Sequence, residues 1–260
     1  NVYGAGSGTD TLVGGQYNPK AGIVYGNTTI NIEGGGVMRN VYGGGEMASV
    51  GTIKTTTKHE ESGTNAHPFY LSWPYELVYD SITIYPAGTR ILTGKTTVNV
   101  TGGRIGITGK DGPTDETEKD NGDIYGGSKG MAFEPYTENL LSNVRETEIN
   151  INIANSTALP ATYKDDWSLA CIAGAVYGGG ENGHVNDSTH ITIENGLVGH
   201  AVYGAGKGKG MYKPSETSPA VYSLTAGKVY GDTHIDVKGG YVVRTVFGGG
   251  NLGSVGKGNY

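Results

Sequence analysis

One short phrase, Val-Tyr-Gly followed by more glycine, recurs along the chain and constrains its fold more than any other feature. Its six copies begin at Val2, Val41, Ile124, Val176, Val202 and Val246, with Ile for Val in the third and Phe for Tyr in the sixth. A second phrase alternates apolar and polar residues, in the copies Ile30-Asn31-Ile32, Val98-Asn99-Val100, Ile151-Asn152-Ile153, Ile191-Thr192-Ile193 and Ile235-Asp236-Val237. Such self-similarity indicates an architecture built from repeats.

The third copy of the second phrase fits the chain in two registers, because Ile149-Asn150-Ile151 has the same pattern. We choose the later register, since it keeps Asn152 in line with Asn31 and Asn99. The choice decides which polar residues form a column on the outer face of the predicted sheet. That column is Asn31, Asn99, Asn152, Thr192 and Asp236.

The spacing between the phrases defines a minimal repeat of 26 residues, from Val176 to Val202. In three copies, the Val of the next Val-Tyr-Gly phrase comes nine positions after the second apolar residue of the alternating phrase. The other copies are longer, so we expect insertions on the flanks. We place these insertions near residues 52–94, 107–121, 131–147, 155–172 and 207–227.

A unit this short is too small to fold alone and can bury its apolar side only by stacking on copies of itself. Period-2 alternation places Ile30, Ile32 and their equivalents inside, and glycine allows positive φ at the corners. Parallel crossovers are almost always right-handed. We therefore predict an all-β fold, a right-handed parallel β-helix (β-solenoid) of about five coils, with residues 1–260 as a single segment. An antiparallel sandwich is the alternative that the pattern leaves open.

Composition and charge exclude several classes of protein. With 47 Gly and 9 Pro among 260 residues, a mainly helical fold is excluded. The net charge of −6 disfavours nucleic-acid and anionic-membrane partners, and no run of about 18 apolar residues could span a bilayer as a helix. Cys171 is the only cysteine, which excludes intrachain disulfides and a four-cysteine zinc site. We expect no cofactor and no metal.

Gly-Gly before an apolar position recurs at the ends of the alternating phrases, as in Gly35-Gly36-Val37, Gly102-Gly103-Arg104-Ile105 and Gly239-Gly240-Tyr241-Val242. Over the whole chain this repeat style resembles bacterial parallel β-helix surface proteins, the large adhesin-like chains of Gram-negative envelopes. The Gly-Gly-apolar motif is similar to that of polymorphic outer-membrane proteins, although their companion Phe-x-x-Asn motif is absent. The resemblance implies secretion, surface display, and binding or scaffolding.

An aromatic residue occupies one position of every Val-Tyr-Gly phrase. In a solenoid these residues would stack about 4.8 Å apart. We predict that they form a structural ladder, because Phe in the sixth copy shows that a ring without a hydroxyl suffices; an exposed strip for sugar rings is the alternative. The ladder is Tyr3, Tyr42, Tyr125, Tyr177, Tyr203 and Phe247.

The longest predicted insertion, 52–94, is rich in aromatic residues that must pack against something. One interpretation is a satellite core on the flank of the solenoid. The other is a binding surface for a partner or a glycan, and its candidate residues are Phe69, Tyr70, Trp73, Tyr75 and Tyr79.

Parallel β-helices also host polysaccharide lyases and hydrolases, whose chemistry needs acidic or basic side chains clustered on one outer face. The best such cluster is His190, His234 and Asp236, in which the two histidines hold equivalent repeat positions. A pair of histidines could also bind a metal, but polar residues are expected on an outward face in any case. We keep a carbohydrate-active enzyme as the alternative and expect no catalysis.

The chain opens on one Val-Tyr-Gly phrase and stops soon after another. We therefore expect a segment of a longer solenoid, or a unit that stacks end to end with copies of itself. The expected function is that of an extracellular structural or adhesive segment of a bacterial surface protein or filament, which displays loops for binding. Its expected partners are a surface glycan or protein, from host or microbe, or further copies of the chain.

Overall fold

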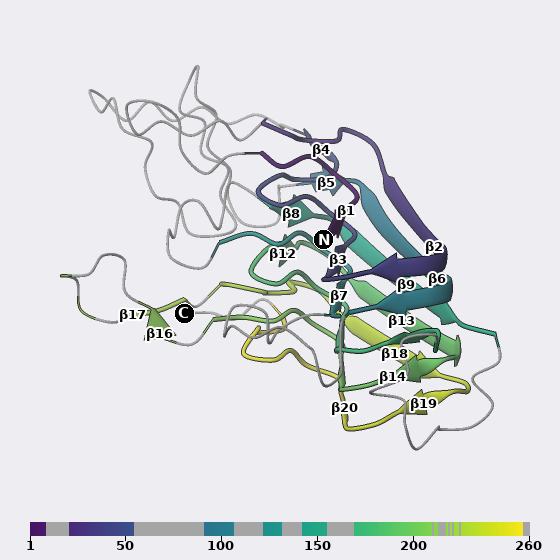
Figure 1. Cartoon of the computed structure of the whole chain (residues 1–260). Coiled ribbons are helices and arrows are strands. Elements are labelled where there is room, and N and C mark those ends of the chain that lie inside the picture. The colour runs from purple at the N-terminus through teal and green to yellow at the C-terminus, as the bar shows by residue number, and fades with distance from the viewer. Residues whose placement is uncertain are drawn as a thin grey trace, which may run out of the picture.

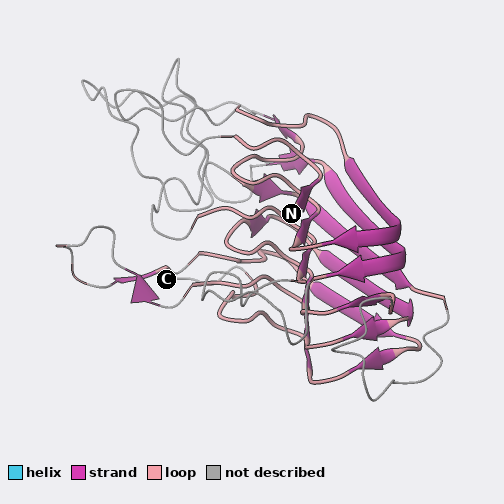
Figure 2. Ribbon diagram, in the orientation of Figure 1, coloured by secondary structure: helices cyan, strands magenta, loops and turns pink. Residues whose placement is uncertain are grey.

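The computed structural model describes residues 1–8, 21–54, 91–106, 122–131, 142–154, 169–209, 211–212, 217, 219, 221–223 and 225–256. This described part consists of strands and the loops between them, without a helix (Figure 2). It accordingly contains no apolar helix of the length needed to cross a membrane.

The Val-Tyr-Gly phrases form one parallel sheet of six strands in chain order. Each aliphatic residue pairs with its equivalent in the next copy, and each aromatic residue does the same, as in Val176 with Val202 and Tyr177 with Tyr203. The predicted repeat is therefore one complete turn of the chain. The strands are β1 (Val2–Tyr3), β3 (Val41–Tyr42), β7 (Ile124–Tyr125), β11 (Val176–Tyr177), β15 (Val202–Tyr203) and β20 (Val246–Phe247).

The alternating phrases form a second parallel sheet of longer strands, which lie side by side in Figure 1. They are β2 (Thr28–Val37), β6 (Lys95–Ile105), β9 (Glu146–Asn152), β13 (Thr189–Asn195) and β18 (Thr233–Val237). Beyond a glycine corner, the last residues of β2 and β6 pair with each other, and three short strands extend this parallel row. These are β10 (Cys171–Ile172), β14 (Leu197–Val198) and β19 (Tyr241–Val242).

A narrow third column closes each turn. Strands β8 (Asn143–Val144) and β12 (His184–Val185) pair in parallel, and single bridges at Val24, Val50, Val229 and Val255 extend the column in both directions. One rung thus runs from a Val-Tyr-Gly strand through this column to a long strand and then to the row beyond the glycine corner. The predicted parallel β-solenoid is confirmed.

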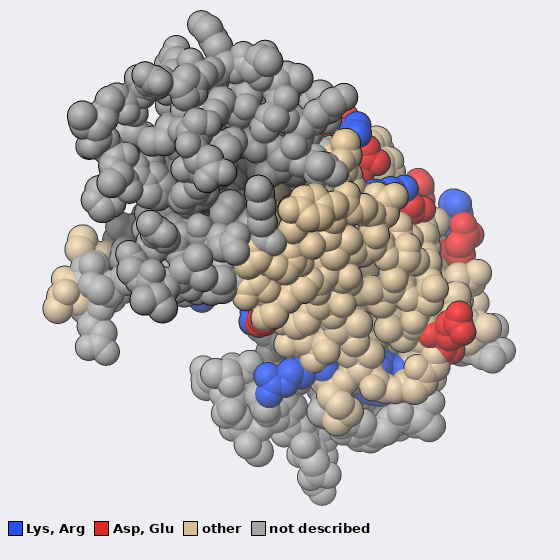
Figure 3. Space-filling model, turned by 90° about the horizontal axis from the view of Figure 1, so that it is seen from above, with Lys and Arg blue, Asp and Glu red and all other residues tan. Residues whose placement is uncertain are grey.

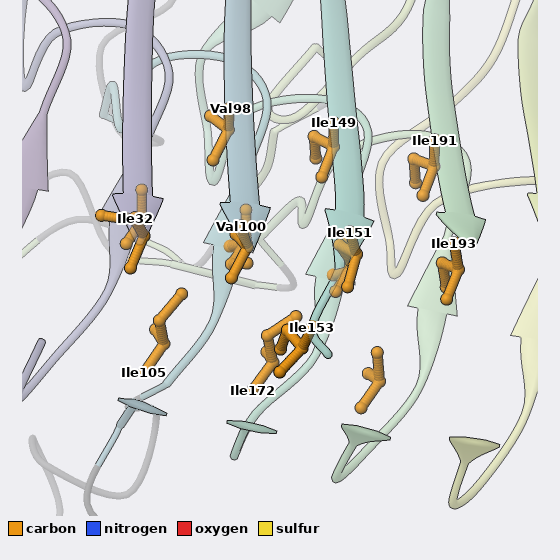
Figure 4. Close-up of a cluster of buried hydrophobic side chains, with 14 of the residues drawn as sticks. Ile32, Val98, Val100, Ile105, Ile149, Ile151, Ile153, Ile172, Ile191 and Ile193 are labelled. Carbon is orange, nitrogen blue, oxygen red and sulfur yellow. The ribbon is translucent and has the colours of Figure 1, made fainter. Parts of the chain in front are cut away.

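The interior is a set of aliphatic ladders that run along the solenoid (Figure 4). Val98, Ile149 and Ile191 occupy one repeat position in successive rungs, and each is at most 1% exposed. Burial of each such side chain contributes about 1.5–3 kcal/mol. Because each rung buries the apolar face of the next, the rungs are stable only as a stack.

The register of β9 differs from the prediction. The phrase Ile149-Asn150-Ile151, not Ile151-Asn152-Ile153, pairs with Val98-Asn99-Val100 and with Ile191-Thr192-Ile193. Asn150 therefore takes the place in the polar column that we had assigned to Asn152. Apolar alternation cannot separate the two registers, because the three isoleucines 149, 151 and 153 are all buried.

A buried threonine sets this register. Two residues before the apolar pair, every long strand has a Thr whose hydroxyl donates a hydrogen bond to the carbonyl of a Val-Tyr-Gly glycine. In the later register Ile149 would stand at this position, and it has no hydroxyl to donate. The pairs, at 2.6–2.7 Å, are Thr28–Gly43, Thr96–Gly126, Thr147–Gly178, Thr189–Gly204 and Thr233–Gly248.

The two glycine corners of a rung use glycine for different reasons. At Gly178 a Cβ atom would lie 2.1 Å from the carbonyl oxygen of Gly204, and its φ is not positive. Positive φ occurs at the corner after the long strands, for example 79° at Gly103 and 80° at Gly240. The expectation of positive φ thus holds at this second corner, while the Val-Tyr-Gly corner needs glycine for the close approach of the next rung.

Two antiparallel ribbons leave the rungs. Strands β4 (Thr52–Lys54) and β5 (Ile91–Thr93) pair where the second rung is interrupted, and β16 (Met211–Tyr212) pairs with β17 (Val221–Tyr222) within 207–227. The rungs themselves extend into two other predicted insertions. Strand β8 and the start of β9 lie within 131–147, and β10 lies at the end of 155–172.

Candidate functional site

The six aromatic residues of the Val-Tyr-Gly phrases form a continuous stack. Neighbouring ring centroids are 4.8–5.0 Å apart, and their planes differ by 4–12°. The rings of Tyr42, Tyr125 and Tyr177 are at most 3% exposed, whereas Phe247 at the last rung is 45% exposed. A sugar ring could not reach the faces of the four inner rings, since each of them is covered on both sides by its neighbours.

Two hydroxyl groups of this ladder donate hydrogen bonds to buried or half-buried carboxylates. Tyr42 donates to Glu181 Oε2 at 2.6 Å, and Tyr125 donates to Asp123 Oδ2 at 3.0 Å. Burial, and after it the nearby carboxylates, raise the pKa of both hydroxyls above the ordinary range of tyrosine. The hydroxyls therefore remain protonated and act as hydrogen-bond donors.

A column of alternating charge, which was not predicted from the sequence, runs beside the hydroxyls. It is formed by the fifth residue after the aliphatic residue of each Val-Tyr-Gly phrase: Ser7, Glu46, Lys129, Glu181, Lys207 and Asn251. Lys129 donates to Glu46 at 2.9 Å, and Ser7 donates to the other oxygen of Glu46 at 3.2 Å. We call this set the charge column.

The charge column makes a small, pH-dependent contribution to stability. The hydrogen bond from Lys129 is the main cause that lowers the pKa of Glu46. Since the folded pKa is lowered, the contribution is present above the usual carboxyl range and is lost as pH falls through the folded pKa. Both side chains are about one-third exposed (35% and 36%), so Glu46→Gln should cost at most about 1 kcal/mol at neutral pH.

Urea unfolding of the Glu46→Gln variant and of the unchanged chain checks this prediction. The difference in unfolding free energy should shrink as pH falls below the usual carboxyl range, and it should disappear once pH is below the lowered pKa of Glu46. The exposed Asp232 provides the control Asp232→Asn, which should show no difference at neutral or at acid pH. A difference for Glu46→Gln that persists in acid would contradict the assignment.

The outward face of the long-strand sheet carries two polar ladders. In the first, Asn150 donates its side-chain amide to Asn99 at 3.0 Å, and Asn99 donates to Asn31 at 2.8 Å. Thr192 and Asp236 continue this ladder toward the last rung. The second ladder consists of Thr29, Thr97, Glu148, His190 and His234.

His190 and His234 are brought together, with ring centroids 4.6 Å apart and planes within 7° of parallel. The lone pair of an imidazole nitrogen lies in the plane of its ring, and lone pairs in two nearly parallel planes do not converge on a shared ion. Asp236 lies on the same face, two residues beyond His234 on β18. In the described residues no group of three or more His, Cys, Asp and Glu side chains is arranged to hold a metal ion.

Two carboxylates near this pair, those of Glu148 and Glu194, have salt-bridge partners. Glu148 is paired with Lys95, and their hydrogen bond lowers the pKa of Glu148. Glu194 accepts a hydrogen bond from Lys238 at 2.8 Å. A general acid in glycoside cleavage needs a raised carboxyl pKa, and the shift of Glu148 has the opposite direction.

The aromatic binding candidates Phe69, Tyr70, Trp73, Tyr75 and Tyr79 lie outside the described residues. The described part does include the base of their insertion. There Thr52 pairs with Thr93, and Lys54 pairs with Ile91, in an antiparallel ribbon. Both ends of residues 55–90 therefore attach at one point of the second rung.

Comparison of the chain with protein-family models, with curated proteins and with solved structures finds no match.

Proposed function

We propose that the chain is an extracellular structural and adhesive segment of a bacterial surface protein or filament. In this proposal the rungs provide rigidity, and the insertions between them provide recognition. The partner of the insertion at 55–90 would be a surface glycan or protein of a host or of another microbe. The resemblance to bacterial β-helix surface proteins supports the same function.

The main support is that the rung register continues across the longest insertion. Before the insertion, Val50 pairs with Val144 of the next rung, and after it Lys95 pairs with Glu146. The ribbon closes on itself at Gly51 and Gly94, where a Cβ atom on Gly94 would lie 2.5 Å from the Cα of Gly51. Because the two ends of the insertion lie side by side, the backbone of the second rung follows the same course without the inserted segment. That segment is therefore available for binding.

The alternative, a polysaccharide lyase or hydrolase that uses His190, His234 and Asp236, gains no support from a specific feature of that face. The two histidines stack on each other, and Asp236 lies in the ladder of hydrogen-bonding side chains described above. We therefore propose the structural and adhesive function alone.

Replacement of residues 55–90 by Asn-Gly tests the proposal. Asn-Gly favours the two-residue turn that joins antiparallel strands, so it would connect Lys54 directly to Ile91. We expect the variant to keep the β-sheet circular dichroism spectrum and the unfolding midpoint of the full chain. We expect it to lose binding to glycan arrays and to cultured cells.

A second variant keeps the length of the insertion and changes Phe69, Tyr70, Trp73, Tyr75 and Tyr79 to Ala. Loss of binding in both variants would assign recognition to these aromatic residues. Binding that survives the deletion would contradict the proposal. Loss of the fold on deletion would instead identify the insertion as a structural brace.

A further inference from the structure

Asparagine is followed by glycine at three places in the chain, Asn121-Gly122, Asn182-Gly183 and Asn195-Gly196. The side-chain amide of an asparagine can react with the backbone nitrogen of the next residue, and glycine, which lacks a Cβ atom, hinders that nitrogen least. The first pair begins outside the described residues. The other two both follow a glutamate, and both asparagines are half-buried. Local geometry is therefore the main difference between them.

The backbone nitrogen of Gly196 is held against the side chain that it would attack. Its N–H donates a hydrogen bond to Oδ1 of Asn195 at 2.9 Å. Because Oδ1 is bonded directly to Cγ, the nitrogen and the carbon of this amide group lie close to each other. Reacting atoms about 3–3.5 Å apart are in the near-attack arrangement from which intramolecular reactions are fast.

The backbone at this position lies at the edge of the regular ladder. The pairing of β13 with β9 shifts register between Ile193 and Asn195, so that Asn195 lies opposite Asn152. Gly196 follows the last residue of β13 and has a φ of 138°, a conformation that favours glycine. Ring closure at this position therefore requires adjustment of the glycine corner and not of the regular part of β13.

The backbone nitrogen of Gly183 is instead engaged by the preceding rung. Its N–H donates to the carbonyl of Lys129 at 3.1 Å, and the N–H of Asn182 donates to the same oxygen at 2.6 Å. The carbonyl of Asn182 in turn accepts the N–H of Gly227 in the next rung at 2.9 Å. A reaction at Gly183 must first break its bond to Lys129, so the rungs on both sides restrain this pair.

We propose that Asn195 is a site of spontaneous self-modification, at which the chain forms a succinimide that water then opens. The nitrogen of Gly196 gives its proton to water or hydroxide and forms a bond to Cγ of Asn195. The bond from Cγ to the amide nitrogen breaks, and this nitrogen takes a proton from water and leaves as ammonia. This modification goes beyond the display function and does not depend on the insertions.

Water opens the succinimide ring in one of two ways. Cleavage of the bond between the ring nitrogen and Cγ leaves an aspartyl residue at position 195. Cleavage of the bond between the ring nitrogen and the backbone carbonyl carbon leaves an isoaspartyl residue. The whole sequence consumes one water molecule and releases one ammonia molecule, without an oxidant, a reductant or a cofactor.

The isoaspartyl form changes the course of the backbone at the corner. The main chain then runs through Cβ and Cγ and gains one atom, and the former backbone carbonyl becomes a free carboxylate. That carbonyl of Asn195 accepts the N–H of Ile153 at 3.0 Å, and the carbonyl of Gly196 accepts the N–H of Tyr241 at 2.7 Å. Since Tyr241 also pairs with Leu197, the extra atom should loosen the fourth rung from both neighbours.

The aspartyl form keeps the backbone and adds only a negative charge. The outward face of the long strands already carries charges of both signs, such as Glu194, which accepts a hydrogen bond from Lys238 at 2.8 Å. Figure 3 shows acidic and basic side chains close together along one side of the molecule. Charges on such a surface contribute little to stability, so the change of the backbone should dominate the effect of the modification.

The measurement is peptide mapping of the folded 260-residue chain during incubation at mildly alkaline pH, with isoaspartate detected by an isoaspartyl methyltransferase and a labelled methyl donor. Asn195 should convert at least about 10-fold faster than Asn182, because only its glycine nitrogen is positioned for attack. In concentrated urea, where the fold is lost, the two pairs should convert at similar rates. The rate at Asn195 should rise with pH, since the attacking nitrogen must lose its proton.

Two glutamine variants complete this experiment. Asn195→Gln should give no product at that position and leave conversion at Asn182 unchanged, because the longer side chain would have to close a larger, less favourable ring. Asn182→Gln is the matched control and should leave conversion at Asn195 unchanged. Equal rates at the two positions in the folded chain would overturn the proposal. So would an Asn195 that stays unconverted while the unfolded chain reacts.

Chromatographic separation of the incubated chain tests the structural consequence. The isoaspartyl form should unfold at a lower urea concentration than the unchanged chain. The variant Asn195→Asp reproduces the aspartyl form and should keep the unfolding midpoint of the unchanged chain. Equal midpoints for the isoaspartyl form and the unchanged chain would contradict the loosening of the fourth rung.

Discussion

Gly178→Ala should prevent the solenoid from folding or destabilise it by at least ~3 kcal/mol, above the usual 1–3 kcal/mol of overpacking. The added methyl carbon would lie 2.1 Å from the carbonyl oxygen of Gly204 and 2.9 Å from both Cβ and Oγ1 of Thr189. The oxygen belongs to the backbone of the next rung and cannot turn aside. The same oxygen accepts the hydrogen bond of Thr189 at 2.6 Å, so any shift that relieves the overlap also disturbs that bond.

Gly248→Ala is the matched control, because it makes the same change at the same repeat position without a rung above it. It should change stability by no more than about 0.5 kcal/mol, as for other surface substitutions. Neither glycine has a positive φ, so backbone strain does not distinguish the two variants. Urea unfolding followed by circular dichroism, at concentrations where the chain is monomeric, measures both. Equal effects would show that the close approach of the rungs is not the reason for glycine at this corner.

The stacking of the rungs could be predicted because it depends on features that repeat. The spacing of Val176 and Val202 equals one turn, and period-2 alternation identifies the inward residues. Both signals reflect geometry that every rung must satisfy. A property shared by all copies is easier to recognise than one that differs from rung to rung.

The register of β9 could not be predicted from apolar residues, since three isoleucines in a row face inward. Thr147 carries the missing information. It is polar but fully buried, and its hydroxyl bond to Gly178 recurs in every rung. Alignment of the long strands on threonine instead of isoleucine would have selected Asn150 for the polar column.

The charge column could also have been found in the sequence, because Glu46, Lys129, Glu181 and Lys207 alternate in sign at one repeat position. The detailed contacts of this column could not. Tyr42 donates to Glu181 at 2.6 Å, although these residues belong to rungs that are not adjacent. Such a contact depends on side-chain length and direction, which the repeat does not specify.

Tyr125→Ala should destabilise the fold by about 3–5 kcal/mol, as expected for truncation of a buried aromatic residue. The ring is fully buried and stacks on Tyr42 at 4.9 Å and on Tyr177 at 4.8 Å. Its removal opens a cavity between two rungs whose backbones are fixed by hydrogen bonds on either side, so the neighbours cannot close it. It also removes the donor to Asp123, whose other carboxylate oxygen accepts the backbone N–H of Ala175 at 2.7 Å.

Two further variants separate the contributions in this experiment. Tyr125→Phe keeps the stacked ring and loses only the hydroxyl, and should cost about 1–2 kcal/mol, because the carboxylate of Asp123 loses one donor. Phe247→Ala removes a ring that is 45% exposed and stacks on Tyr203 alone, and should cost about 1 kcal/mol in the monomer. Unfolding midpoints in urea rank the three variants. Equal losses of unfolding free energy in Phe247→Ala and Tyr125→Ala would show that covering both faces of a ring does not account for the stability of the ladder.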